Sequence, residues 1–103
     1  LFDVDFSSTK LERVRSGESA MDHAMLFTGV DLDEAGQPRA WRVENSWGDE
    51  PGDSGFFTMD DQWFTDNVFE VVVPKSALPE DLAAAVDAEP IVLPAWDPMG
   101  TLA

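Results

Sequence analysis

The sequence contains no cysteine and only one histidine. Without cysteine the chain forms no disulfide, offers no thiolate ligand to a metal, and has no thiol nucleophile of its own. One histidine is a poor basis for a zinc site, which needs three or four converging ligands. We therefore expect no metal and no other cofactor, and the lack of cysteine fits a reducing compartment.

Basic residues are also scarce, since six Lys and Arg stand against 21 Asp and Glu, for a net charge of −15. A field of that sign repels phosphate backbones, so we expect no nucleic-acid partner. No apolar run is long enough to span a membrane, and no basic start followed by an apolar run predicts a signal peptide. Leu1 as first residue suggests a mature or excised segment. The 44% apolar fraction predicts one globular domain.

In the first half of the chain, local patterns predict one helix and a hairpin. Thr9 and Glu12 predict a capping box for a short helix over residues 10–15. The apolar residues 20–32 predict a strand buried on both faces. Turn-forming residues at 31–38, followed by alternation over 40–45, predict a β-hairpin.

The second half predicts two more strands, a helix and a tail. Residues 56–59 predict a short strand, after which Asp60 and Asp61 begin a brief helix over 62–66. Residues 68–74 have the strongest strand propensity in the chain. A helix is predicted over 79–89, and the prolines of 90–103 predict an extended tail docked on a partner surface. The sum is an α+β chain with three or four antiparallel strands.

One acidic turn imitates a calcium loop. Residues 31–36 begin like such a loop, but Ala35 stands at its fifth position and Arg42 at its twelfth, where a calcium loop needs oxygen ligands. We interpret this turn as a solvated hairpin tip.

A second imitation lies at residues 52–55, Gly-Asp-Ser-Gly, which look like the nucleophile loop of chymotrypsin-like serine proteases. The chain continues with Phe56 instead of the glycine that this loop requires. The separation between His23 and Ser54 is also too short for two barrels. A serine protease is therefore excluded.

His23 gains significance from the segment Asn45-Ser46-Trp47-Gly48. An asparagine oxygen that accepts a hydrogen bond from one imidazole nitrogen fixes the ring and leaves the other nitrogen to face a thiol. An imidazolium beside a thiol lowers the thiol pKa and keeps it as nucleophilic thiolate. An indole that covers the His–Asn bond strengthens it by excluding water. Taken singly, Asn45 is more often a turn residue and Trp47 a core aromatic.

Taken together, these residues resemble the β-rich right-hand domain of papain-like cysteine peptidases, and most closely the bleomycin hydrolase and aminopeptidase C family. The resemblance covers nearly the whole chain. It is carried by MDHAM at 21–25, WRVENSWG at 41–48, MDDQWF at 59–64, VFEVVV at 68–73 and EPIVLPAWDPMGTLA at 89–103.

The resemblance implies that His23 is the general base and ion-pair partner, Asn45 its orienting residue and Trp47 the shield of the bond between them. The catalytic cysteine, and the Gln that completes the oxyanion hole, are then expected on an N-terminal part of the polypeptide, so this chain alone is expected to be inactive. The family also implies a peptide substrate, a cytoplasmic location and a homo-oligomer, a hexamer in full-length members.

Residues 1–89 are accordingly expected to form the C-terminal half of a catalytic domain, and 90–103 an arm in the active-site cleft. In this family the terminal carboxylate of the arm limits how far a substrate extends. That role falls here to Ala103, with Leu102 beside it, and it makes the enzyme an aminopeptidase.

The alternative is a non-catalytic β-domain that serves assembly or peptide binding. The absence of cysteine from the chain is the observation that keeps this alternative open.

Overall fold

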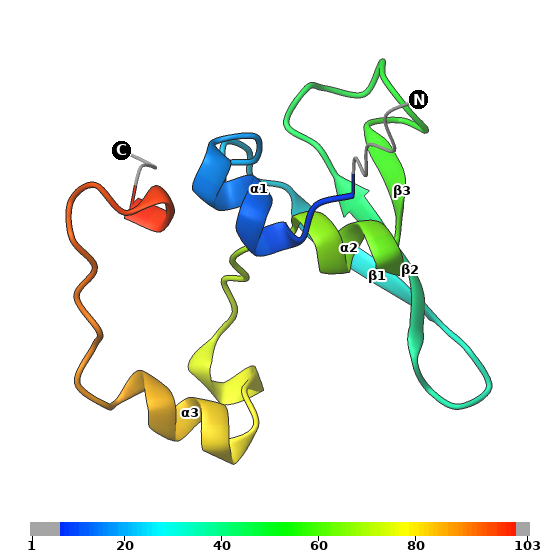
Figure 1. Cartoon of the computed structure of the whole chain (residues 1–103). Coiled ribbons are helices and arrows are strands. Elements are labelled where there is room, and N and C mark those ends of the chain that lie inside the picture. Colours follow the sequence, from blue (N-terminus) through cyan, green and yellow to red (C-terminus); the bar gives the residue numbers. More distant parts are fainter. Residues whose placement is uncertain (1–6, 101–103) are drawn as a thin grey trace, which may run out of the picture.

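The computed structural model describes residues 7–100, which form a small antiparallel sheet, short helices and a long C-terminal segment that leaves the sheet (Figure 1). The strands lie in the order β1-β2-β3, as expected for an α+β chain. No helix within this range is long and apolar enough to cross a bilayer. The elements are α1 (Lys10–Ser16), β1 (Leu26–Leu32), β2 (Pro38–Glu44), β3 (Phe56–Asp60), α2 (Asp61–Asn67), η1 (Lys75–Ala77), α3 (Glu80–Val86) and η2 (Pro98–Gly100).

The predicted capping box of α1 is confirmed. The Thr9 hydroxyl accepts the Glu12 N–H at 3.2 Å, and the Glu12 carboxylate accepts the Thr9 N–H at 2.8 Å. The hydrogen bond from the Thr9 backbone, and then that from its hydroxyl, hold the pKa of Glu12 below its usual 4.5. The helix ends at Gly17, whose left-handed φ of 77° lets its N–H bond to the Val14 carbonyl.

We expect Thr9→Ala to destabilise α1 by about 1 kcal/mol, because the Glu12 N–H loses the hydroxyl that accepts its hydrogen bond. The pKa of Glu12 is lowered on folding, so its contribution is present above the unfolded pKa and is lost as the pH falls through the folded value. Amide hydrogen exchange of α1, corrected for intrinsic rates, should therefore accelerate below that pH. Glu12→Gln should abolish the pH dependence, and a dependence that persists in this variant would contradict the assignment.

The predicted hairpin is formed by β1 and β2, paired from Leu26↔Glu44 to Leu32↔Pro38 with two register shifts. At its tip the Asp33 carboxylate accepts the N–H groups of Ala35 and Gln37, each at 2.8 Å. The carboxylate is thus used to close an exposed turn, in agreement with a solvated tip.

The prediction of a doubly buried strand over residues 20–32 is wrong in two respects. The strand begins only at Leu26, because β2 ends at Glu44 and Asn45 turns away to bond the Gly55 carbonyl. In the part of the chain that the structure describes, residues 20–25 therefore have no strand to pair with. The apolar side chains of Leu26, Val30 and Leu32 are also exposed in this chain.

The sheet is held to α2 by an aromatic cluster of Phe27, Trp41 and Phe64. The ring of Trp41 stacks on Phe64 at 4.9 Å, and Phe27 meets both rings edge-on. The Trp41 indole N–H donates to the Asp61 carboxylate at 3.0 Å. Val43 of β2, 1% exposed, is the most deeply buried large side chain among residues 7–100. The core thus lies between the sheet and α2, whose start at Asp60-Asp61 agrees with prediction.

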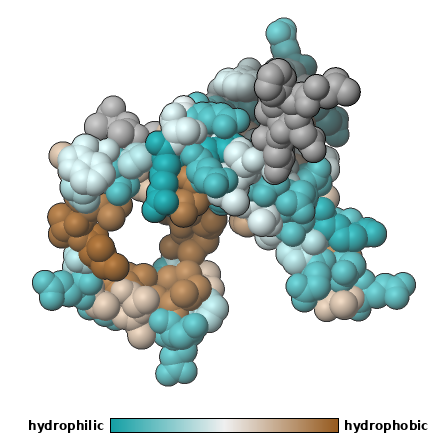
Figure 2. Space-filling view, in the orientation of Figure 1, coloured by the Kyte–Doolittle hydropathy of each residue, from teal (hydrophilic) through white to brown (hydrophobic). Residues whose placement is uncertain are grey.

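Residues 68–74 were predicted as a strand, and this prediction is wrong. β-propensity measures the fit of a side chain to a paired, half-buried surface. Within the described range 7–100 these residues pair with no strand, and Val72 remains 88% exposed. The predicted helix over 79–89 is also shorter, since α3 ends at Val86. Figure 2 shows apolar surface around an opening in the molecule. The segments on either side of α3 expose several large apolar side chains, namely Val71, Val72, Ile91, Val92 and Leu93.

Candidate active site

His23 and Asn45 lie at the same end of the β1–β2 ladder. Leu26↔Glu44 is the terminal pair of that ladder. Asn45 follows Glu44 directly, and His23 precedes Leu26 in the segment that makes no strand pairing. The antiparallel register therefore brings together two residues that are 22 positions apart in sequence.

The two side chains are joined by a hydrogen bond of 2.8 Å between His23 Nε2 and Asn45 Oδ1. The same Asn45 atom accepts the Ser46 N–H at 2.8 Å. A backbone N–H requires an acceptor, so the atom between them is the amide oxygen. Nε2 must then carry a proton, and in the neutral ring Nδ1 is the basic nitrogen. Nδ1 makes no hydrogen bond to any residue in the range 7–100, so it is free to accept a proton.

Trp47 lies over the imidazole of His23. The ring centroids are 5.3 Å apart and the planes are inclined by 23°, which is a stacked arrangement. Phe57 of β3 meets the indole nearly perpendicularly at 6.5 Å. Trp47 is still 64% exposed, so one face of the indole supports the imidazole while the other faces solvent.

The loop that begins with Asn45 and carries Trp47 is held at its other end by Gly55. The Gly55 carbonyl accepts the Asn45 N–H at 3.1 Å, and Gly55 itself is buried with a φ of 85°. A Cβ on Gly55 would lie 2.6 Å from the Gly48 carbonyl oxygen. Only glycine fits this approach, so Gly55 fixes the loop that presents the asparagine. In the sequence, Gly55 stood out as the last residue of the Gly-Asp-Ser-Gly segment at 52–55.

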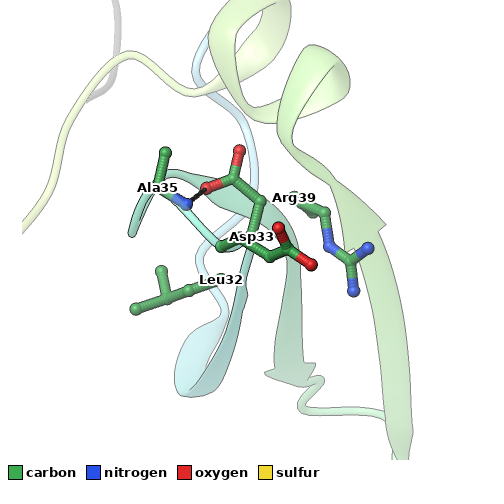
Figure 3. Close-up of a pocket in the computed structure, with 5 residues that line it drawn as sticks. Leu32, Asp33, Ala35 and Arg39 are labelled. Atoms are coloured by element: carbon green, nitrogen blue, oxygen red, sulfur yellow. Dashed lines mark hydrogen bonds between the residues drawn. The ribbon is translucent and has the colours of Figure 1, made fainter.

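Two concavities of the surface lie away from this site, since neither is lined by His23 or Asn45. One is formed at the hairpin tip by Leu32, Asp33, Glu34, Ala35 and Arg39, and Figure 3 shows the Asp33 carboxylate turned toward the Ala35 N–H within it. Its polar atoms serve the turn, and Arg39 pairs with Asp31 at 2.7 Å. This concavity at the hairpin tip is therefore not part of the site around the His23 imidazole. Among residues 7–100 no three His, Asp or Glu side chains converge as metal ligands would.

The predicted substrate-limiting residues, Leu102 and Ala103, lie outside the described residues. The part of the tail that is described ends in η2, which lies near α1 (Figure 1). Before it the chain is extended, and Ile91 is 90% exposed. The placement of the arm in a cleft stays a prediction.

Comparison with known proteins gives a consistent result. Residues 1–100 match the family model described as Peptidase C1-like family. The chain is 54% identical to aminopeptidase C of Lactobacillus helveticus over 106 residues, covering all of this chain and 23% of that protein. It is 52% identical to bleomycin hydrolase of Homo sapiens over 96 residues, covering 91% of this chain and 21% of that protein.

Among solved structures, PepW from Lactobacillus rhamnosis superimposes with a TM-score of 0.82 at 48% identity. The match covers 99% of this chain and 23% of that one. The chain thus spans about a quarter of the length of the relatives that it matches, and its fold is that of the corresponding part of a papain-like peptidase.

Proposed function

This chain belongs to the Peptidase C1-like family, and from that premise we propose that it supplies the histidine and asparagine of a Cys-His-Asn triad in a cysteine aminopeptidase. The observation that carries the proposal is the hydrogen bond between His23 Nε2 and Asn45 Oδ1, with Trp47 stacked on the ring. The names of the relatives, aminopeptidase C and bleomycin hydrolase, support a peptidase that acts at N-termini.

The chemistry follows from the tautomer. With Nε2–H held by Asn45, the basic Nδ1 accepts the proton of a thiol placed beside it, which leaves a thiolate paired with an imidazolium. The thiolate attacks the peptide carbonyl, and the imidazolium donates its proton to the departing amine. Water then hydrolyses the acyl-enzyme with the same ring as base. Asn45 keeps the ring in one tautomer and orientation through both steps.

The chain has no cysteine, so the nucleophile must come from another part of the polypeptide, together with the Gln of the oxyanion hole. We further propose that the tail over residues 90–103 occupies the cleft and that the carboxylate of Ala103, beside Leu102, pairs with the ammonium group of a peptide substrate. A homo-oligomer, a hexamer as in full-length family members, and a cytoplasmic location complete the proposal.

Co-expression with the upstream part of the polypeptide should restore hydrolysis of an aminoacyl-amide substrate that is blocked by a thiol reagent. The chain alone should show none. An N-terminally acetylated substrate is the matched control, because it lacks the ammonium group and should be cleaved poorly. A complex that assembles but shows no thiol-dependent hydrolysis would favour the alternative of a non-catalytic β-domain.

A further inference from the structure

The segment that carries His23 has few supports of its own. Residues 20–25 belong to no ladder, so the imidazole is held between two anchors, one before and one after this segment. The later anchor is Leu26, where pairing with Glu44 begins. The earlier anchor is the Ser19 N–H, which donates to the Arg13 carbonyl of α1 at 3.1 Å. The position of α1 therefore influences where the imidazole lies.

α1 is in turn fastened to the end of α2 by two cations. Arg13 donates to the Ser8 carbonyl at 2.7 Å and to the Asp66 carbonyl at 2.8 Å. Lys10 donates to the carbonyls of Thr65 and Val68, and its ammonium lies 4.8 Å from the centre of the Phe69 ring. α2 has no basic residue in its last turn, so these two side chains satisfy carbonyls at the negative end of its dipole.

α2 is itself fixed to the sheet through Phe64, which packs on Trp41 of β2 and Phe27 of β1. β2 runs directly into Asn45. One continuous series of contacts therefore leads from Asn45 through the sheet, α2 and Arg13 to Ser19 and His23. Within this series Arg13 makes two links, because its side chain donates to the Asp66 carbonyl and its own carbonyl accepts the Ser19 N–H.

We propose that Arg13, assisted by Lys10, is a positioning residue that sets the imidazole of His23 against Asn45. The proposal rests on the proposed function for its kinetic consequence, while its geometric consequence is independent of turnover. Arg13 touches neither His23 nor Asn45 and acts only through the backbone at Ser19.

The test compares Arg13→Ala with Arg15→Ala in the full-length polypeptide. Arg15 lies on the same helix and is exposed, and its side chain makes no hydrogen bond or ion pair within residues 7–100, so it controls for loss of charge and of helix propensity. Arg13→Ala should lower kcat about 10- to 100-fold with KM nearly unchanged, because displacement of a reacting group by about 1 Å has an effect of that size. Arg15→Ala should behave as the wild type.

The second readout is the ¹⁵N NMR spectrum of the His23 ring in the isolated chain at alkaline pH, assigned by its disappearance in His23→Gln; the isolated chain has no cysteine, so the ring forms no thiolate–imidazolium pair there. The wild type should show the Nε2-protonated tautomer, and Arg13→Ala should show a mixture. If the wild-type chain shows this tautomer and Arg13→Ala shows the mixture, while the full-length polypeptide shows no thiol-dependent hydrolysis, the proposed function fails and the positioning role stands.

A wild-type kcat and a wild-type ring spectrum in a folded Arg13→Ala variant would overturn the role. If Arg13→Ala fails to fold, Arg13→Lys decides, because lysine keeps the charge but lacks the fork that reaches two carbonyls. An intermediate kcat with unchanged KM supports the proposal, and a wild-type kcat overturns it.

Discussion

Replacement of His23 by alanine in the full-length polypeptide is expected to lower kcat by about 10²- to 10⁴-fold, the usual contribution of a positioned general base. The loss has a second cause, because the thiol also loses the imidazolium that holds it as thiolate. The rate of thiol alkylation should therefore shift to higher pH, toward the unperturbed thiol pKa of about 8.5. Kinetics with an aminoacyl-amide and an alkylation pH profile measure the two effects separately.

The Asn45→Ala variant tests how much the orientation of the His23 ring contributes to kcat, apart from the ring's role as a base. It leaves the imidazole in place but removes the oxygen that holds Nε2–H, so kcat should fall less than in His23→Ala. Arg39→Ala is the control, since Arg39 lies at the far end of the hairpin in an exposed ion pair worth little. Activity that survives both His23→Ala and Asn45→Ala would refute the triad.

The largest effect on stability is expected from Trp41→Ala, about 3 kcal/mol, the lower end of the range for a core aromatic because Trp41 is only partly buried. The variant loses the stack on Phe64, the edge contact with Phe27 and the hydrogen bond to Asp61. A loss of this size is a large fraction of the stability of a small domain, which is about 5–15 kcal/mol. We therefore expect the sheet to be largely unfolded when Trp41→Ala is made in the isolated chain. Urea denaturation and amide exchange along β2 would measure this.

Trp96→Ala is the matched control, because Trp96 is 80% exposed and lies in the tail. Its free energy of unfolding should stay within about 0.5 kcal/mol of the wild type. Trp41→Phe, which keeps an aromatic ring but loses the N–H donor, should give an intermediate value. Equal losses from Trp41→Ala and Trp96→Ala would show that the cluster is not the core.

The juxtaposition of the site residues could be predicted from sequence because it depends on one hairpin. Once residues 31–38 form the turn, antiparallel pairing places the residue after β2 beside the segment before β1. His23 and Asn45 then meet, as the structure has them. The capping box of α1 could also be predicted from sequence, because its hydrogen bonds join residues that are only three positions apart.

Features that depend on distant parts of the fold could not be predicted. The valines at 71–73 have strand propensity, but propensity does not supply a partner strand. The prediction that residues 20–32 are buried on both faces was wrong for a related reason. An apolar composition does not show which other part of the protein covers a strand. The bonds from Lys10 and Arg13 to the end of α2 span more than 50 positions and leave no local pattern in sequence.

The hairpin tip has a practical consequence. Asp33 and Gly36 lie at the end of β1 and β2 opposite His23 and Asn45, separated from them by six or seven strand residues, or about 20 Å. Its turn is exposed and closed by local bonds alone. An affinity tag or a fluorophore inserted there should leave the chemistry intact, which makes this turn the place to attach a reporter for following assembly of the complete enzyme.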